Sequence, residues 1–292
     1  MKKYLILWII ALVFSVGLVV AGKPDTNLVP ATNTKADISL TIPKHAVEVA
    51  PGVFSLGTAA DVDGREVEGF AIFEKREFAK PGAVCGNGIC EPGENANKCA
   101  ADCSGGSTTS SCFSYLANGA KWKTLESWFV NPSNTQGINA DYVLSNVVDD
   151  IQKWEDVSVN ILGGGSSTAE SLVADTSSPD GLNEVYFGDV SNSGAIAVTI
   201  VWGIFRGPPS QRELVEWDQV YDQVDFSWST AGEVGKMDFE NIATHEIGHS
   251  VGMGHPSSEC TEETMYAYAD FGETKKRTLE AGDITGVKGL YN

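Results

Sequence analysis

The sequence predicts a chain of the α/β (α+β) class, in which a twisted mixed sheet packs against a central helix and a C-terminal helix. Strand-like and helix-like patterns alternate from Cys112 to Asn292. Hydrophobic residues make up 42% of the 292 residues, which is enough for a buried core. A small β-rich segment and a short disulfide-rich unit precede this domain and differ from it in composition.

Residues 1–21 are typical of a signal peptide. Lys2 and Lys3 precede an apolar run from Tyr4 to Val20, and the small residues Ala21 and Gly22 follow it. An uncleaved membrane anchor is the alternative, because the run approaches the length that spans a bilayer. We therefore expect a secreted, extracellular protein, or a membrane-anchored one where the segment is retained.

Residues 22–80 are predicted to be an N-terminal β-rich segment or a propeptide. Residues 38–42 alternate between apolar and polar types, and residues 67–73 are apolar and aromatic. A turn is predicted between them at residues 61–64, where aspartate and glycine recur.

Residues 81–104 form a small cysteine-rich unit, and residues 105–111 a Ser/Gly/Thr-rich linker. An even number of cysteines in an exported chain indicates disulfides, and four of them allow three pairings. A four-cysteine zinc knuckle is the alternative. Outside this unit, Cys112 and Cys260 remain as a further pair. The four cysteines of the unit are Cys85, Cys90, Cys99 and Cys103.

Residues 112–292 contain the predicted strands and helices of the main domain. Asn139 can cap a helix through Trp154, and Asp238 can cap a second helix through about Val251. A last helix is predicted over residues 280–290. The predicted strands are residues 126–130, 157–162, 184–190, 195–205 and 214–224.

The net charge of −19 argues against a nucleic-acid partner, because phosphate contacts need a basic face. Acidic side chains suit calcium sites or simply a solvated surface. One group lies between two predicted strands and could bind Ca²⁺ or form a solvated acidic loop. Its members are Asp175, Asp180, Asn183, Glu184 and Asp189.

The segment His245-Glu-Ile-Gly-His-Ser-Val-Gly-Met-Gly-His255 has the residues that a zinc site needs. A catalytic zinc takes three neutral imidazoles at about 2.0 Å and keeps one open position. His245 and His249 lie one helical turn apart and share a face. Gly252 can adopt a positive φ and end the helix, so that the chain turns back and His255 reaches the same ion.

Glu246 is the predicted catalytic residue. It lies between the helical histidines, where it can hydrogen-bond a water at the zinc rather than bind the metal. It would act first as general base and then as general acid during peptide hydrolysis.

This segment, together with Thr264-Met265-Tyr266 and the ending GDITGVKGLY, resembles the metzincin zinc metalloproteases. The resemblance is matrixin-like, with Pro256 as a serralysin-like feature. It implies a metzincin-type catalytic domain over residues 112–292, an active-site helix, and Met265 in a Met-turn beneath the zinc. Ala267 stands where serralysins and astacins have a tyrosine ligand, and no cysteine-switch sequence lies upstream.

The resemblance also implies a function. We expect a zinc metalloendopeptidase that cleaves protein or peptide substrates, with one catalytic Zn²⁺. By analogy of fold, residues 195–205 would form an edge strand to which substrate backbone pairs. The alternative is a catalytically weak, zinc-containing surface or binding module that uses the protease fold as a scaffold.

Overall fold

The computed structural model describes residues 39–76, 111–192 and 194–292, and Asp37–Asn292 make up one compact unit. The predicted signal peptide and cysteine-rich unit lie outside the described residues. None of the helices in the described ranges combines the length and the apolar character that a membrane span requires.

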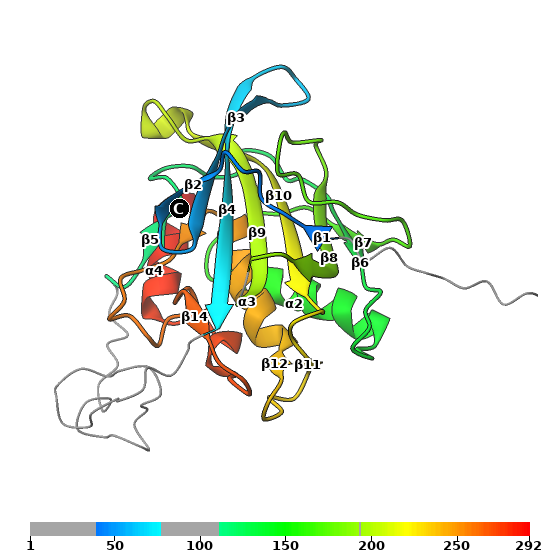
Figure 1. Ribbon diagram of the computed structural model, residues 1–292. Coiled ribbons are helices and arrows are strands. Elements are labelled where there is room, and N and C mark those ends of the chain that lie inside the picture. Colours follow the sequence, from blue (N-terminus) through cyan, green and yellow to red (C-terminus); the bar gives the residue numbers. More distant parts are fainter. Residues whose placement is uncertain (1–38, 77–110, 193) are drawn as a thin grey trace, which may run out of the picture. The chain divides into compact units, whose positions relative to one another are not determined.

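A ten-stranded mixed sheet forms the centre of this unit (Figure 1). Its main path is β2-β3-β4-β9-β10-β8-β6-β7, while β1 pairs with β8 and β14 pairs with β4. β9 is antiparallel to both of its neighbours, whereas β8 is parallel to β10 and β6. The strands are β1 (Ser39–Leu40), β2 (Val47–Ala50), β3 (Val53–Ala60), β4 (Glu66–Arg76), β6 (Trp128–Asn131), β7 (Gly165–Ser167), β8 (Asn183–Val190), β9 (Ala195–Ile204), β10 (Glu213–Asp222) and β14 (Tyr268–Ala269).

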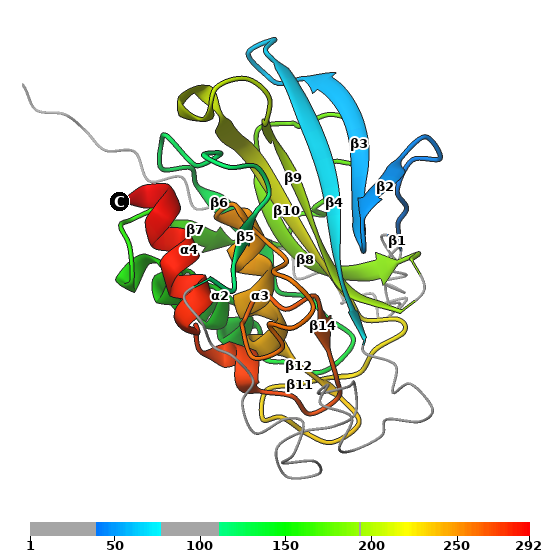
Figure 2. The same ribbon diagram turned by 90° about the vertical axis from the view of Figure 1, so that its left-hand side faces the viewer.

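The three α-helices of the described chain lie on one face of the sheet (Figure 2). They are α2 (Ala140–Asp156), α3 (Phe239–Ser250) and α4 (Ala281–Tyr291). The predicted caps are confirmed: the Asn139 side chain accepts from the N–H of Tyr142, and that of Asp238 accepts from the N–H of Asn241. Short elements complete the fold: the 3₁₀ turns η1 (Pro209–Gln211) and η2 (Lys275–Arg277), and the pairs β11 (Trp228–Ser229) with β12 (Met237–Asp238) and β5 (Ser114–Tyr115) with β13 (Met253–Gly254).

The N-terminal segment is β-rich, as predicted, and it is part of the main sheet. β3 and β4 form a hairpin, in which the Asp61 side chain accepts from the N–H groups of Asp63 and Arg65 at the turn. β4 then pairs with β9 along most of its length, from Glu68 opposite Gly203 to Lys75 opposite Ala195.

The prediction of a buried strand at residues 157–162 is wrong. Ile161 and Leu162 are buried, but their N–H groups donate to the Glu155 carboxylate at 2.7 and 2.9 Å instead of to a neighbouring strand. A side chain at the end of α2 therefore satisfies backbone groups that a sheet would otherwise pair.

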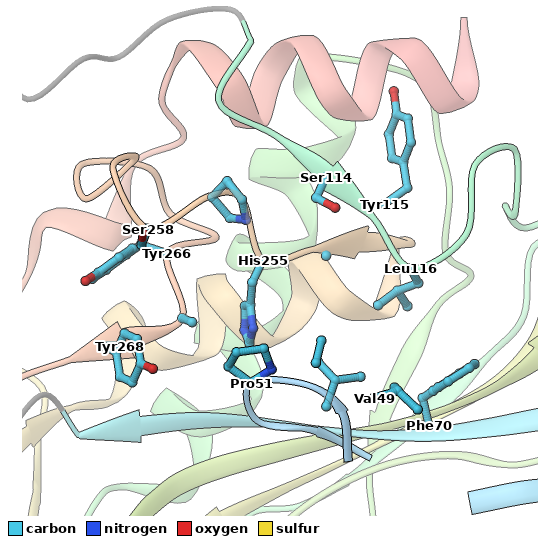
Figure 3. Close-up of a pocket in the computed structure, with 15 residues that line it drawn as sticks. Val49, Pro51, Phe70, Ser114, Tyr115, Leu116, His255, Ser258, Tyr266 and Tyr268 are labelled. Atoms are coloured by element: carbon cyan, nitrogen blue, oxygen red, sulfur yellow. The ribbon is translucent and has the colours of Figure 1, made fainter. Parts of the chain in front are cut away.

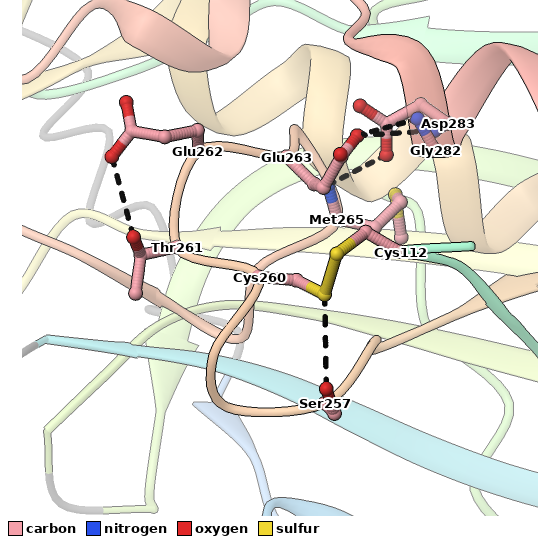
Figure 4. The surroundings of a disulfide bond; sticks show 9 residues. All are labelled: Cys112, Ser257, Cys260, Thr261, Glu262, Glu263, Met265, Gly282 and Asp283. Carbon is pink, nitrogen blue, oxygen red and sulfur yellow. Dashed lines mark hydrogen bonds between the residues drawn. A yellow bond between two sulfur atoms is a disulfide. The ribbon is translucent and has the colours of Figure 1, made fainter. Parts of the chain in front are cut away.

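Cys112 and Cys260 form a disulfide, as predicted, with their Cα atoms 5.6 Å apart (Figure 4). It ties the beginning of the main domain to the loop that follows His255. Beside it, the Glu263 carboxylate accepts from the N–H groups of Gly282 and Asp283 at the start of α4, at 3.0 and 3.2 Å. This loop is thus attached both to the start of the main domain and to the start of α4.

Candidate metal centre and catalytic site

α3 carries the first two histidines of the motif and is buried along nearly its whole length. Asp238 caps its N-terminus and also pairs with the Arg277 guanidinium at 2.8 and 2.6 Å. The helix ends as the sequence predicts, because Gly252 has a φ of +99° and its N–H donates to the His249 carbonyl. The chain then reverses through β13 and returns His255 to the helix.

The three histidines converge on one point. Their Nε2 atoms are separated by 3.1 Å (His245 to His249), 3.1 Å (His249 to His255) and 3.3 Å (His245 to His255). Imidazole nitrogens around a tetrahedral zinc at about 2.0 Å lie about 3.3 Å apart. The arrangement therefore fits a zinc ion with three protein ligands.

The hydrogen bonds of two rings support the same fit. The Nδ1 atoms of His245 and His249 face the carbonyl oxygens of Thr264 and Met253 at 2.7 and 2.9 Å, so Nδ1 must carry the proton. Their Nε2 atoms then present lone pairs to each other, an arrangement that a shared cation satisfies. Burial lowers the pKa of all three imidazoles, that of His249 to about 4, which keeps the rings neutral.

Glu246 is fully buried beside these rings. Its Oε2 accepts from the hydroxyl of Thr199 on β9, while Oε1 has no partner among the described atoms. Burial, followed by the neighbouring Glu74 charge, raises the pKa of Glu246 well above its usual range. Thr199 thus orients this carboxylate, and no sequence motif marked it for that role.

Met265 lies directly beneath α3, buried against Gly248. A Cβ atom at Gly248 would lie 2.1 Å from the Met265 sulfur, so only glycine at this motif position permits the contact. The Asp283 carboxylate accepts from the N–H groups of Thr264 and Met265 at 2.8 and 3.2 Å and so fixes the turn (Figure 4). The methionine predicted from the resemblance therefore packs under the histidine helix.

A buried ion pair that the sequence did not reveal lies next to the histidines. Lys276 of η2 and Glu74 of β4 are both fully buried, and the Lys276 ammonium donates to the Glu74 carboxylate and to the Tyr266 carbonyl. Burial raises the pKa of Glu74 to about 7, although Lys276 acts against this shift. The Glu74 Oε1 atom is 3.8 Å from His245 Nδ1.

β4 covers the strand that was predicted to be a free edge. β9 pairs with β10 on one side and with β4 on the other, so the prediction that residues 195–205 form an edge strand is wrong for this chain. Beyond its pairing with β3, the end of β4 lies between β9 and β14. Lys75 lies opposite Ala195 on one side and Tyr268 on the other, and β4 is antiparallel to β9 and parallel to β14.

A cavity of about 350 Å³ opens beside His255. Figure 3 shows His255 in its lining together with Pro51 and Val49 of the N-terminal segment and with Tyr266 and Tyr268 beyond Met265. The N-terminal segment therefore contacts the histidine site at two places: β4 beside His245, and the turn between β2 and β3 beside His255.

Of the residues predicted for calcium, the structure brings only Asp175 into a carboxylate cluster. It meets Glu216 and Asp218 of β10, and the three offer oxygens within 4.8 Å of one another. Asn183 uses its amide instead to bond the backbone of Ser127 and Trp217. Burial raises the pKa of Asp175 to about 6 and that of Glu216 to about 8.

Comparisons with known proteins converge on the same part of the chain. The sequence model of the matrixin family matches residues 208–292, which include α3 and α4. Matrilysin of Homo sapiens is 36% identical over 74 residues, covering 25% of this chain and 26% of matrilysin. Metalloendoproteinase 1-MMP of Arabidopsis thaliana is 43% identical over 68 residues, covering 23% of this chain and 18% of that protein.

The chain spans about a quarter or less of the length of these curated relatives. The matched region nevertheless holds all three converging histidines, Glu246 and Met265. Together, the family match and the mixed sheet with its histidine helix make the C-terminal region of this chain similar to the catalytic domain of matrixin-like metzincins.

Proposed function

We propose that this protein is a secreted zinc-dependent endopeptidase. The observation that carries the proposal is the convergence of three imidazole Nε2 atoms within 3.3 Å of one another, next to the buried Glu246 carboxylate. Neutral nitrogen ligands and an adjacent carboxylate are the donor set of a hydrolytic zinc site. The signal-like residues 1–21 support export.

The residues have distinct roles in this proposal. His245, His249 and His255 hold zinc, which when bound supplies a Lewis acid that polarises a peptide carbonyl and acidifies water. Glu246 takes a proton from the attacking water and delivers it to the leaving amine. Thr199 holds one carboxylate oxygen of Glu246, which leaves the other free for this proton transfer. Met265 supports the histidine helix from below.

We infer that substrate takes the place of β4. An extended peptide that pairs with β9 and β14 would pass beside Glu246, and β4 fills this path in the full chain. Residues 22–80 would then be a propeptide that blocks the site by strand pairing. Its removal exposes the edge of β9, which fits the absence of a cysteine-switch sequence upstream.

Digestion of casein by the exported protein tests the function. We expect cleavage that a zinc chelator abolishes and that zinc restores. Glu246→Gln should lower the rate at least about 100-fold, because general acid–base catalysis is worth about 10²–10⁴-fold. Equal cleavage by the variant would contradict the assigned role. A catalytically weak binding module, the alternative function, would bind zinc but leave casein intact.

N-terminal sequencing of the active form tests the role of the first segment. A start between β4 and Cys112 is the expected result, because it removes the strand that covers β9. An active form that still begins before residue 66 and contains β4 would contradict the propeptide assignment.

A further inference from the structure

A buried positive charge lies beside the histidines. Lys276 has none of its surface exposed, and its ammonium lies 3.4 Å from His245 Nδ1. That ring nitrogen already donates to the Thr264 carbonyl, so it offers Lys276 no lone pair. Among the described residues, Glu74 is the acidic group that bonds to the ammonium.

Glu74 belongs to the strand that occupies the proposed substrate path. Ile72 lies opposite Thr199, whose hydroxyl bonds to Glu246, and Glu74 lies two residues further, opposite Ala197. The side chains of residues 72 and 74 share the face of the strand that points toward α3. The backbone between them therefore passes beside Glu246, and the Glu74 carboxylate reaches past it to Lys276.

The backbone of this stretch is held on both sides, as that of a bound peptide would be. Lys75 N–H donates to the carbonyl of Ala267 and Arg76 N–H to that of Gly194, at 3.3 and 3.1 Å, and both acceptors belong to the main domain. Main-chain hydrogen bonds of this kind contribute affinity for a peptide of any sequence, whereas the pockets for its side chains determine specificity. The pocket that receives Glu74 contains a cation.

Lys276 stays in place when β4 leaves. Its own N–H donates to the Asn241 side chain at 2.8 Å, and Asn241 lies on α3 one turn before His245. The backbone of Lys276 is therefore anchored to α3, independently of β4. Loss of Glu74 removes the carboxylate partner of this ammonium and leaves it the Tyr266 carbonyl, so a new carboxylate at the same position would restore its counter-charge.

We propose that Lys276 makes this endopeptidase selective for peptides with glutamate at the position that Glu74 occupies, the first or second residue after the cleaved bond. The proposal rests on the proposed zinc peptidase function and names its substrate class. The substrate carboxylate replaces that of Glu74, and β4 resembles a bound substrate. A neutral side chain at this position leaves the Lys276 ammonium unpaired, which disfavours its binding.

Peptide cleavage kinetics test the proposal. The full chain, expressed for export and incubated until its casein cleavage is constant, is given peptides with Glu, Gln, Asp or Leu at each of the two positions. We expect kcat/KM to fall about 100-fold or more from Glu to Gln or Leu, since sites built for a polar partner reject analogues that lack it. Equal values for Glu, Gln and Leu would overturn the proposal.

Lys276→Met should reverse this order, so that Leu becomes the better side chain while the preferences at other positions stay unchanged. Lys275→Met is the matched control, because Lys275 is the partly exposed neighbour that bonds to the Thr261 carbonyl. It should retain the glutamate preference. If Lys276→Met folds poorly, the Lys276→Met/Glu74→Leu double variant removes both charges, and the peptide series on the unaltered protein still decides the matter.

The outcomes distinguish a failure of the selectivity proposal from a failure of the proposed peptidase function. Absence of any cleavage that depends on Glu246 contradicts the peptidase function. Cleavage that depends on Glu246 but ignores the charge of the substrate contradicts only the role of Lys276, which would then be limited to holding β4.

Discussion

Glu74 on β4 and the pair Glu216 and Asp218 on β10 are buried carboxylates of one sheet, and the half-buried Asp175 joins the second group. The charges of the two groups are balanced differently. Glu74 meets the Lys276 ammonium, which comes from a segment distant in the sequence. The cluster gathers three carboxylates, and no salt bridge from a described basic side chain reaches any of them.

The difference shows how each group depends on the rest of the molecule. The Glu74–Lys276 pair exists only while the N-terminal segment is present, so it couples this segment to the histidine site. The carboxylate cluster belongs to the main domain alone, and protons or a cation must balance it.

The largest effect on stability is expected from removing one member of the Glu74–Lys276 ion pair. Lys276→Met in the full chain leaves Glu74 buried without its cation and should lower the free energy of unfolding by about 3–5 kcal/mol. The Lys276→Met/Glu74→Leu double variant should recover most of this loss, because two apolar side chains carry no charge to bury. Chemical denaturation measures both. A single variant as stable as the double one would show that the pair does not couple the segments.

The carboxylate cluster predicts a smaller, pH-dependent effect. The folded pKa values of Asp175 and Glu216 in this cluster are raised to about 6 and 8, mainly by burial. The folded protein therefore holds protons that the unfolded chain has already released above about pH 4. The contribution of these carboxyls to stability should be greatest at or below this pH and decline as the pH rises toward 8, by up to about 1.4 kcal/mol per pH unit for each proton released.

Thermal or chemical denaturation between pH 4 and 8 in calcium-free buffer checks this slope. Glu216→Gln removes the group whose pKa is raised to about 8, and it should flatten the decline near neutral pH. Lys276→Met is the control, because it should leave the contribution of Glu216 to the pH dependence of stability unchanged. Identical slopes in the unaltered chain and Glu216→Gln would contradict the assignment.

The smallest effect is expected at Thr199, which bonds to the Glu246 carboxylate and belongs to neither the Glu74–Lys276 pair nor the carboxylate cluster. Thr199→Val keeps the shape of the side chain but removes the hydroxyl that donates to Glu246. We expect kcat to fall about 10-fold and stability to change by about 1 kcal/mol, the net worth of one hydrogen bond. Thr199→Ser should keep most of the rate. An unchanged kcat in Thr199→Val would remove Thr199 as a positioning residue.

Local sequence was sufficient to predict much of the histidine site and its helix. The spacing of His245 and His249, the cap at Asp238 and the positive φ at Gly252 all depend on interactions within a few residues. The strands β8, β9 and β10 and the helices α2 and α4 were also predicted: β9 has a long apolar run, and the apolar residues of α2 fall on one face.

Long-range pairing could not be predicted in this way. Glu74 and Lys276 are 202 residues apart, and neither belongs to a pattern that marks a buried ion pair. The pairing of β4 with β9 likewise depends on which edge of the sheet remains open after the domain folds. For residues 157–162 a strand was predicted that does not form. Their strand-like composition could not reveal that the Glu155 side chain accepts hydrogen bonds from their backbone.

The zinc content of the purified full chain tests the central claim most directly. Elemental analysis should find about one zinc ion per chain in the unaltered protein and in Glu246→Gln, because three imidazoles hold the ion and the carboxylate does not. His249→Ala, which removes the middle ligand, should contain almost none. An unaltered protein without zinc, even after incubation with the metal, would contradict the account.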